Sequence, residues 1–465
     1  MPPAPLVPRS AIGGVVWPAL PDAATARLLA LMWQLDASQW WSAAQLRQQQ
    51  QRQLAALVAH AATTVAHYED AFRAAGWTPA DGVDAAAWAR LPLLTRQALI
   101  DGGPRLLSRA YPAAHGRVEE VATSRTSGEP VRVRASEVVS TLWLALTLRD
   151  HLWHRRDLSA RLAAIRYVAD GALPPDGVRG QGWGPATVAL APDAPLSLLS
   201  VASTTEEQVA WLVREDPAYL LVYPTVLDAI VRRLAATGRR LPALREVRTI
   251  SEALAPETRA LCRDVLGVRV VDTYSAQEVG YIALECPDRA PGEERYHVQA
   301  ERVLVEVLAA DGTPCAPGEV GRVVITDLHN FATPLVRYEI GDYAEVGAPC
   351  TCGRGLPVLA RIVGRRRGML VYPDGRTAWP LFTVACRTAA RYRELQLVQD
   401  TASALRLRVV AEPGAALTDA DRRALIAALH GSLGYPFGVT IEEVAQLARS
   451  PAGKLEEFVS LVAVA

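Results

Sequence analysis

Lysine is almost absent from this chain. Of its 49 basic residues, 48 are arginine and a single one, Lys454, is lysine. Arginine ends in a broad planar guanidinium, whereas lysine ends in a compact ammonium on a slim, flexible stem. A site that needs the compact cation would explain the one exception, while chance survival of a lysine in an arginine-rich sequence is the alternative. Lys454 is therefore our first candidate for a catalytic residue.

Net charge and long apolar runs are also missing. The 49 basic residues are balanced by 49 acidic ones, so the overall charge gives no reason to expect nucleic acid or an anionic membrane as a partner. No stretch approaches the roughly 20 apolar residues of a membrane-spanning helix. The first 20 residues are rich in proline and lack the basic start and apolar centre of a signal peptide. We therefore expect a cytoplasmic protein that acts on a small molecule.

Cysteine is scarce as well, with six residues in 465. So few cysteines in so long a chain do not form a disulfide framework. Cys286, Cys350 and Cys352 have spacings better suited to a metal, and the last two lie in one tight turn that can present two thiolates to the same ion. With His297 they would complete a tetrahedral zinc shell. Ordinary buried cysteines beside a strand histidine are the alternative.

Half of the residues are apolar, which suits a globular protein of two or more domains. The stretch 37–76 has helical periodicity and predicts one or two packing helices. From about residue 198 strands and helices alternate: strands are expected at 219–223, 247–251 and 268–274, and helices at 225–236 and 256–266, ended by Gly238 and Gly267. This β-α-β-α-β order predicts a parallel sheet.

Beyond Gly280 the pattern changes to shorter strand-like pieces with turns, which indicate a small β-barrel or an antiparallel sheet. The last hundred residues contain strand-like segments at 395–398, 405–410 and 439–444 and a helix at 419–433. We therefore predict an α/β protein with a large N-terminal domain, residues 1–363, that holds the parallel sheet and the small β subdomain. A small α/β lid domain, residues 364–465, would follow a hinge at 364–368.

In open parallel sheets, ligands bind in the crevice at the carboxyl ends of the strands. Here those ends are three segments that should face one pocket: Tyr223-Pro224-Thr225, Ser251-Glu252-Ala253 and Tyr274-Ser275-Ala276-Gln277-Glu278. A second candidate region is the hydroxyl-rich turn from Thr123 to Pro130. Its hydroxyl and backbone N–H groups can hold phosphate oxygens, although such clusters are more often plain surface loops, and the Gly-Lys-Ser/Thr ending of a Walker loop is missing.

Five motifs in order give the chain a family resemblance. They are the turn Thr123–Pro130, the Tyr-x-x-x-Glu-x-Gly pattern of Tyr274–Gly280, the Arg-Tyr-x-x-Gly-Asp pattern of Arg337–Asp342, the hinge pattern Arg361–Arg365 and the final Gly453-Lys454. The chain resembles the adenylate-forming superfamily of acyl-CoA synthetases, luciferases and peptide-synthetase adenylation domains. Within it, the sequence is most similar to the phenylacetate-CoA ligase branch, over nearly its whole length.

The resemblance implies a role for each matching residue. Tyr274 would stack on adenine, Asp342 would accept hydrogen bonds from the ribose hydroxyls, Arg365 would assist there, and Glu278 would hold Mg²⁺. The other nucleotide contacts would be Thr123, Ser124, Thr126, Ser127, Gly128, Ser251, Glu252, Ala253 and Ser275, and the acyl pocket would include Tyr223, Pro224 and Thr225. The alternatives are that Tyr274 belongs to the core, Glu278 is a helix-start charge and Asp342 is a turn residue.

Catalysis in this family implies a further role for Lys454. Its ammonium would bridge the substrate carboxylate and the α-phosphate of ATP, two anions that otherwise repel each other. After adenylation the lid would rotate about residues 365–368 and withdraw Lys454. Some members of the branch also carry a structural zinc, which is what the cysteine-histidine set would hold.

Three residues depart from the family pattern. Arg125 stands where glycine is usual, Glu129 where many members carry lysine, and Gln277 where threonine is usual. They affect the expected geometry of the phosphate turn more than the reaction type.

The sequence thus predicts an ATP- and Mg²⁺-dependent ligase that forms an acyl-adenylate and transfers the acyl group to CoA. An amine or a carrier-protein thiol as acceptor is the alternative, and a non-catalytic nucleotide-binding relative is an alternative of another class. The acid itself is not readable from the chain, and a small or aryl acid is expected by analogy alone.

Overall fold

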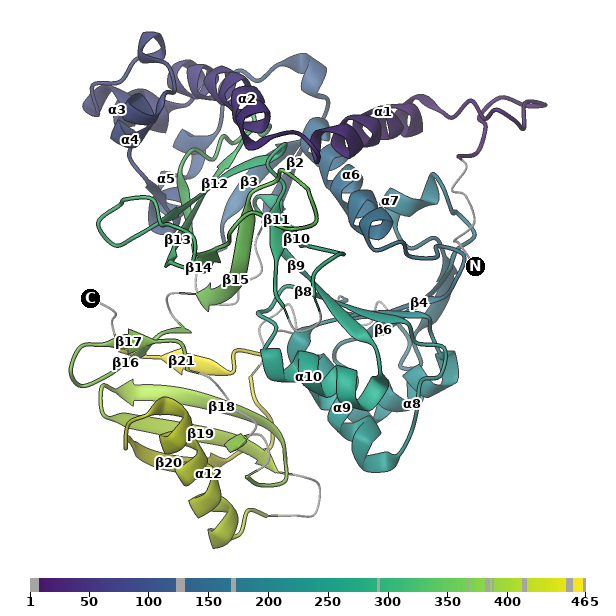
Figure 1. Ribbon diagram of the computed structural model, residues 1–465, viewed down its shortest axis with the longest axis vertical. Coiled ribbons are helices and arrows are strands. Elements are labelled where there is room, and N and C mark those ends of the chain that lie inside the picture. Colours follow the sequence, from purple (N-terminus) through teal and green to yellow (C-terminus); the bar gives the residue numbers. More distant parts are fainter. Residues whose placement is uncertain are drawn as a thin grey trace.

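The computed structural model describes residues 8–122, 130–168, 173–290, 293–365, 368–380, 385–386, 389–411, 416–448 and 455–462. Two lobes of unequal size are visible in Figure 1, a large one and a smaller one at the lower left, which holds the residues after 368. Within the described ranges, no helix is both long and apolar enough to cross a bilayer.

Helices cover the upper part of the large lobe in Figure 1. The expected helical stretch 37–76 is divided by residues 39–42, because Ser42 caps a new helix through a capping box with Gln45. The helices of this part, with three short 3₁₀ turns, are α1 (Ala23–Ser38), α2 (Ala43–Thr64), α3 (Ala66–Ala74), η1 (Pro79–Asp81), α4 (Ala85–Arg90), α5 (Arg96–Gly102), η2 (Gly103–Leu106) and η3 (Ala113–His115). A hairpin and a long helix follow: β2 (Val118–Ala122), β3 (Arg132–Ser136) and α6 (Glu137–Trp153).

The predicted parallel sheet is present, and its alternation of strand and helix from residue 219 to 276 is confirmed. Its elements are β4 (Leu162–Arg166), β5 (Val178–Gln181), α7 (Pro185–Val188), β6 (Pro195–Ser200), α8 (Thr205–Glu215), β7 (Tyr219–Val222), α9 (Pro224–Thr237), β8 (Glu246–Ile250), α10 (Pro256–Leu266) and β9 (Arg269–Ala276). The parallel strands lie in the order β6-β4-β7-β8-β9, and β5 pairs antiparallel with β6. Gly238 and Gly267 end their helices in the left-handed conformation.

Antiparallel strands continue the same sheet beyond β9. They are β10 (Gly280–Glu285), β11 (Tyr296–Val298), β12 (Val303–Leu308), β13 (Val320–Asp327), β14 (Tyr338–Val346) and β15 (Val358–Arg365), with the short β1 (Leu94–Thr95) alongside β14. The path β9-β10-β11-β15-β14-β13-β12 is open, so of the two expected forms the antiparallel sheet describes this region. β15 runs to Arg365, and the first two residues of the expected hinge therefore belong to this strand.

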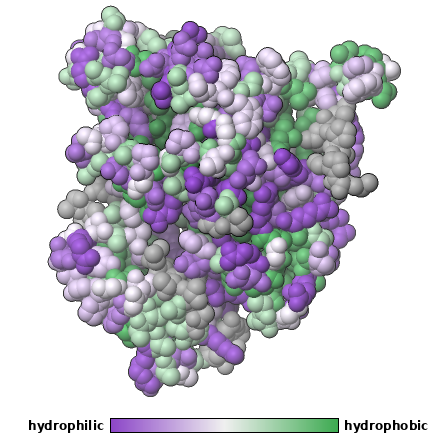
Figure 2. Space-filling view, in the orientation of Figure 1, coloured by the Kyte–Doolittle hydropathy of each residue, from purple (hydrophilic) through white to green (hydrophobic). Residues whose placement is uncertain are grey.

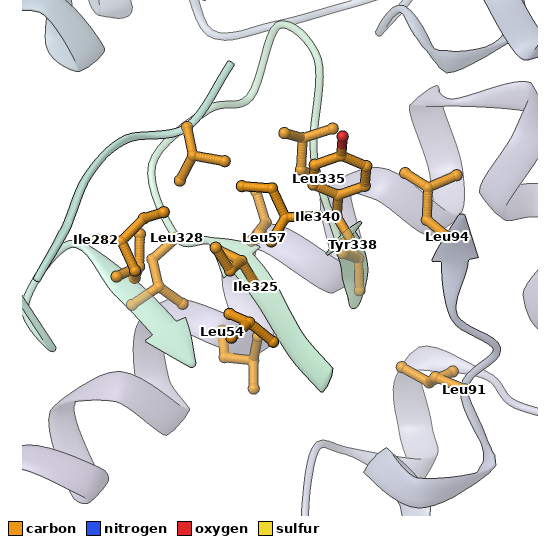
Figure 3. Close-up of a cluster of buried hydrophobic side chains, with 14 of the residues drawn as sticks. Leu54, Leu57, Leu91, Leu94, Ile282, Ile325, Leu328, Leu335, Tyr338 and Ile340 are labelled. Atoms are coloured by element: carbon orange, nitrogen blue, oxygen red, sulfur yellow. The ribbon is translucent and has the colours of Figure 1, made fainter. Parts of the chain in front are cut away.

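The core between α2 and the antiparallel strands is aliphatic. Figure 3 shows Leu54 and Leu57 of α2 beside Ile282, Ile325 and other side chains of this cluster. Both leucines are buried, and each buried leucine contributes about 1.5 to 3 kcal/mol to folding. The helical layer is thereby fixed on one face of the sheet.

The smaller lobe has its own sheet and core, as expected for a separate α/β unit. Its elements are β16 (Leu370–Val371), β17 (Thr377–Ala378), β18 (Tyr392–Thr401), β19 (Ala404–Ala411), α12 (Asp419–Leu433), β20 (Gly438–Glu443) and β21 (Phe458–Ser460). The order β20-β19-β18-β21 places the last strand at an edge. Leu425, Leu429 and Leu433 of α12 pack on this sheet.

Charged side chains are buried together near the amino ends of β8 and β9. Arg156 bonds to Asp150 at 2.7 Å and to Glu246 at 2.5 Å. His154 lies beside them, where Arg269 Nη2 is 3.2 Å from its Nδ1 and the Glu285 carbonyl oxygen is 3.2 Å from its Nε2. Burial, aided by the charge of Arg156, lowers the pKa of His154 to about 3.

This histidine should make the protein sensitive to acid. The unfolded chain binds the proton near pH 6.5 and the folded chain only near pH 3, so the stability supported by neutral His154 is lost as pH falls between these values. At pH 5 its share of the loss is about 2 kcal/mol. We expect His154→Gln to reduce the drop in the free energy of unfolding between pH 7 and pH 5 by about that amount. Urea unfolding of both proteins at both pH values measures it, and equal drops would contradict the assignment.

Candidate active site

A cleft with a volume of about 270 Å³ opens at the carboxyl ends of β8 and β9, where the two lobes meet. Figure 2 shows hydrophilic residues gathered across the middle of this face, near that junction. The cleft is lined by Ser251, Glu252, Ala253, Leu254, Asp272, Thr273, Tyr274, Ser275, Tyr296, Asp342, Ile362, Gly364, Arg365, Gly368, Leu455, Glu456 and Phe458. Residues from both lobes therefore form one site, which polar and apolar side chains line together.

The segment after β8 forms one wall of the cleft. Ser251 has a φ of 74°, in the left-handed region that non-glycine residues rarely adopt, and such strain is concentrated at functional sites. Glu252 Oε2 accepts hydrogen bonds from the backbone N–H and the hydroxyl of Thr225, at 3.0 and 2.9 Å. Its carboxylate thus lies at the N-terminus of α9, where the helix dipole favours a negative charge.

Of the three predicted strand-end segments, Tyr223 to Thr225 does not line the cleft. It reaches the site through the bonds from Thr225 to Glu252. The hydroxyl oxygen of Tyr223 accepts a hydrogen bond from the backbone N–H of Tyr167 at 3.2 Å. Tyr223 is buried while Tyr167 is exposed, so this pair links the buried segment to the surface of the lobe.

Asp342 is the centre of the cleft's hydrogen bonding. The hydroxyl of Tyr274 donates to its Oδ2 at 2.8 Å, and Nε of Arg365 lies 3.4 Å from its Oδ1. Asp342 and Arg365 are cross-strand partners on β14 and β15. Burial, followed by the charge of Asp342, raises the pKa of Tyr274 well above its usual value, so the phenol stays a donor and holds the carboxylate in place.

Glu278 lies in the turn between β9 and β10 and is buried. It does not line the cleft. The Tyr338 hydroxyl donates to its Oε1 at 3.1 Å, and Nη1 of Arg96 lies 3.5 Å from the same oxygen. Figure 3 shows the Tyr338 ring among aliphatic side chains, and burial raises the pKa of this phenol. Tyr338 is therefore a fixed donor, and within the described residues Oε2 of Glu278 makes no hydrogen bond.

The tail before β21 closes the cleft from the smaller lobe. Leu455, Glu456 and Phe458 line it, and the backbone N–H of Leu397 in β18 donates to the Glu457 carbonyl at 2.8 Å. Lys454, which precedes Leu455 in the sequence, lies outside the described residues. So do the candidate phosphate residues Thr123, Ser124, Thr126, Ser127 and Gly128, with Arg125 and Glu129.

The four predicted metal ligands meet at the far end of β10. The ligand atoms of Cys286, His297, Cys350 and Cys352 all lie within 4.8 Å of one another. The Sγ atoms of Cys286 and Cys350 are 3.8 Å apart, and Sγ of Cys352 is 3.3 Å from Nε2 of His297. Zn–S bonds of about 2.3 Å in a tetrahedron place two sulfurs about 3.8 Å apart. The donor set and its spacing therefore fit a zinc ion.

The loop that carries two of these cysteines is held against the start of α2. The guanidinium of Arg354 lies between two indoles, 4.9 Å from the ring centroid of Trp40 and 4.7 Å from that of Trp153. Its Nε donates to Oε1 of Gln39 at 2.9 Å, and its Nη1 to Asp288 at 2.8 Å. This packing joins the cysteine cluster to the N-terminal helices.

No protein-family model matches the chain. A phenylacetate-coenzyme A ligase of Escherichia coli (strain K12) is 26% identical over 357 residues, which cover 72% of this chain and 75% of that protein. One from Aromatoleum evansii is 25% identical over 331 residues, covering 70% and 72%. Among solved structures, a 2-hydroxyisobutyryl-CoA ligase in the postadenylation state superimposes with a TM-score of 0.70 at 17% identity, over 91% of each chain.

The chain is therefore similar in sequence to phenylacetate-coenzyme A ligases, and it has the fold of a solved adenylate-forming CoA ligase. An anthranilate CoA ligase with bound anthranoyl-AMP shares the fold at a TM-score of 0.52 and 17% identity, over 72% of this chain and 65% of that one. The mixed sheet and the separate C-terminal sheet are thus the fold expected of an adenylate-forming ligase.

Sequence reasoning missed several residues of the site. Asp272 and Thr273 line the cleft beside Tyr274, and Asp272 lies two positions before Tyr274, on the same face of β9. Asp272 accepts hydrogen bonds from the hydroxyls of Thr249 at 2.6 Å and Tyr296 at 3.0 Å. Strand periodicity could have found Asp272, but no local signal marks Arg96 as a neighbour of Glu278.

Proposed function

We propose that this chain activates a carboxylic acid with ATP and then transfers the acyl group to CoA. The observation that carries the proposal is the position of Asp342. Tyr274 and Arg365 hold it in the cleft at the strand ends. The segment that follows the only lysine in the sequence lines the same cleft from the smaller lobe. Relatives named phenylacetate-coenzyme A ligases support the acid and the CoA acceptor.

In the first step a carboxylate oxygen attacks the α-phosphorus of ATP and pyrophosphate leaves. In the second, the CoA thiol attacks the acyl carbon, AMP leaves and the thiol proton is released. Asp342 would accept hydrogen bonds from the ribose hydroxyls, because an ionised carboxylate has free lone pairs beyond the one that Tyr274 uses. The Tyr274 ring and the 251–253 wall would enclose the adenine. Both reactants are anionic, so the residues work by positioning and by neutralising charge.

Lys454 would supply the cation of the first step. The next residue, Leu455, lines the cleft. Because consecutive Cα atoms are only about 3.8 Å apart, this position of Leu455 supports the proposed role of Lys454. The smaller lobe would act as a lid, with the division near residue 364 and the rotation about the residues that follow β15. Withdrawal of the lid would then open the adenylate to the thiol.

Two metals fit different parts of the chain. Mg²⁺ would be held by Glu278, whose Oε2 makes no hydrogen bond within the described part of the chain while Tyr338 and Arg96 hold Oε1. When bound, the ion neutralises phosphate charge. Zinc would be held by Cys286, His297, Cys350 and Cys352 and would staple the antiparallel strands to the N-terminal helices. A cytoplasmic location stays a prediction.

Pyrophosphate exchange with a panel of small and aryl acids tests the proposal, with thioester formation followed in parallel. We expect ATP-pyrophosphate exchange with at least one acid, and a thioester when CoA is added. Exchange without a thioester would favour an amine or a carrier-protein thiol as acceptor. If no acid supports exchange while the protein still binds ATP, the chain is a nucleotide-binding relative and the proposal is wrong.

A further inference from the structure

A buried ion pair lies behind the Glu278 turn, outside the cleft. Arg302 and Asp327 form two parallel bonds, Nη1 to Oδ1 and Nη2 to Oδ2, the latter at 2.7 Å. Their side chains are only 2% and 0% exposed. Replacing such a pair by apolar residues often leaves stability unchanged or improved. A contribution to folding stability is therefore a weak explanation for the presence of this ion pair.

One end of the pair holds the turn that presents Glu278. Nη2 of Arg302 donates to the carbonyl oxygen of Val279 at 2.9 Å, and Val279 is the residue after Glu278. The next residue, Gly280, has a φ of 97°, and a Cβ at this position would lie 3.2 Å from a ring carbon of Trp143, so no other residue fits there without strain. The guanidinium and Gly280 together fix the exit of the turn.

The other end reaches the hairpin around the phosphate motif. Oδ1 of Asp327 accepts hydrogen bonds from the backbone N–H groups of His329 and Asn330, at 3.0 and 3.2 Å. Oδ1 of Asn330 accepts from the backbone N–H of Thr333 at 3.2 Å, and Oγ1 of Thr333 accepts from the backbone N–H of Arg134 in β3 at 2.9 Å. β2 and β3 form an antiparallel pair whose last partners, Ala122 and Arg132, lie on either side of the candidate phosphate segment in the sequence.

We propose that Arg302 and Asp327 are positioning residues that hold the Glu278 turn and strand β3 at a fixed separation for the phosphates of Mg·ATP. Neither residue lines the cleft, so the pair acts through Glu278 on one side and β3 on the other. The connection is continuous and buried, which suits the transmission of a fixed geometry. The inference rests on the proposed function for its substrate, Mg·ATP.

The test uses the double variant Arg302→Met/Asp327→Leu, because removing one partner alone leaves a buried charge and endangers folding. The matched control is Arg149→Met/Glu301→Leu, which removes a pair with an equally buried arginine, 2% exposed, whose guanidinium bonds to the Leu35 carbonyl and to Gln299. Thermal unfolding establishes that both variants are folded. Calorimetric titration with Mg·ATP and steady-state exchange then provide the two readouts.

We expect the Arg302/Asp327 double variant to bind Mg·ATP roughly 10-fold more weakly and to raise the KM for Mg·ATP to the same extent, because a shift of about 1 Å in positioned groups costs up to 100-fold. The KM for the acid should stay within about two-fold of wild type, and the control should show neither change. Equal loss in both double variants, or unchanged Mg·ATP binding in a folded Arg302/Asp327 variant, would overturn the inference. If wild type binds Mg·ATP but exchanges with no acid, the proposed function fails, and the titration still decides the role of the pair.

Discussion

Replacing Lys454 by alanine should lower pyrophosphate exchange by about 100- to 1000-fold, the range found when one positioned group that stabilises transition-state charge is removed. The physical reason is that attack brings a carboxylate against the α-phosphate, and only a cation between them relieves the repulsion. Binding of Mg·ATP should change far less, because the proposed adenine and ribose contacts of Tyr274 and Asp342 would remain. Exchange kinetics under saturating acid, with a binding titration, separate the two effects.

Lys454→Arg should lose most of the activity too. Guanidinium keeps the charge but is planar and broad, and the gap between two reacting anions suits the compact ammonium. Near-normal exchange in Lys454→Arg would remove this size argument, and near-normal exchange in Lys454→Ala would remove Lys454 from the mechanism. Since the chain has no other lysine, an amine-selective reagent modifies Lys454 and the chain's amino terminus only. Protection of Lys454 by ATP and the acid would locate it independently.

Wild-type protein should contain one zinc ion per chain, and Cys352→Ser should lose it. Structural zinc contributes folding energy because its thiolates and imidazole form the site only in the folded chain. We expect a loss of about 5 kcal/mol and a drop in Tm of about 10 °C. Metal analysis by mass spectrometry and thermal unfolding measure the two effects, and exchange activity at low temperature should persist because the cluster does not line the cleft.

The control for the zinc prediction is Cys262→Ser. Cys262 is fully buried in α10 and lies outside the cluster, so its replacement should cost packing but leave the zinc in place. Retention of zinc by Cys352→Ser would contradict the assigned ligand set. An equal fall in Tm for both variants without zinc loss would show that the cysteines are ordinary core residues.

The parallel half of the fold could be predicted because its signals are local. The strands β7, β8 and β9 are short segments rich in apolar and β-branched residues, and α9 and α10 each begin at a proline and are followed by a glycine. The neighbours of these strands could not be predicted in the same way. β4 joins the sheet beside β7, and β6 lies beside β4, yet β5 and α7 come between β4 and β6 in sequence, so the pattern that marks β-α-β units is broken.

The site shows the same division between local and long-range information. Its backbone positions at the ends of β8 and β9 follow from the rule on strand ends, whereas contacts such as Arg96 with Glu278 join residues 182 positions apart. Arg337 is a further example. It belongs to a matched motif, but its side chain donates to the Leu91 carbonyl at 2.6 Å and pairs with Glu306. A sequence cannot separate an arginine that binds substrate from one that holds backbone.

Besides lining the cleft, Leu455 also belongs to the hydrophobic packing of the smaller lobe. It packs with Val410 and Leu447 in a small apolar cluster of the smaller lobe, while β21 is hydrogen-bonded in parallel to β18. Leu455 and β21, which follow Lys454 in the sequence, are thus packed and hydrogen-bonded within the smaller lobe. Any rotation of that lobe would carry the tail with it as one body. The proposed approach of Lys454 to the phosphates would therefore depend on the orientation of the whole smaller lobe.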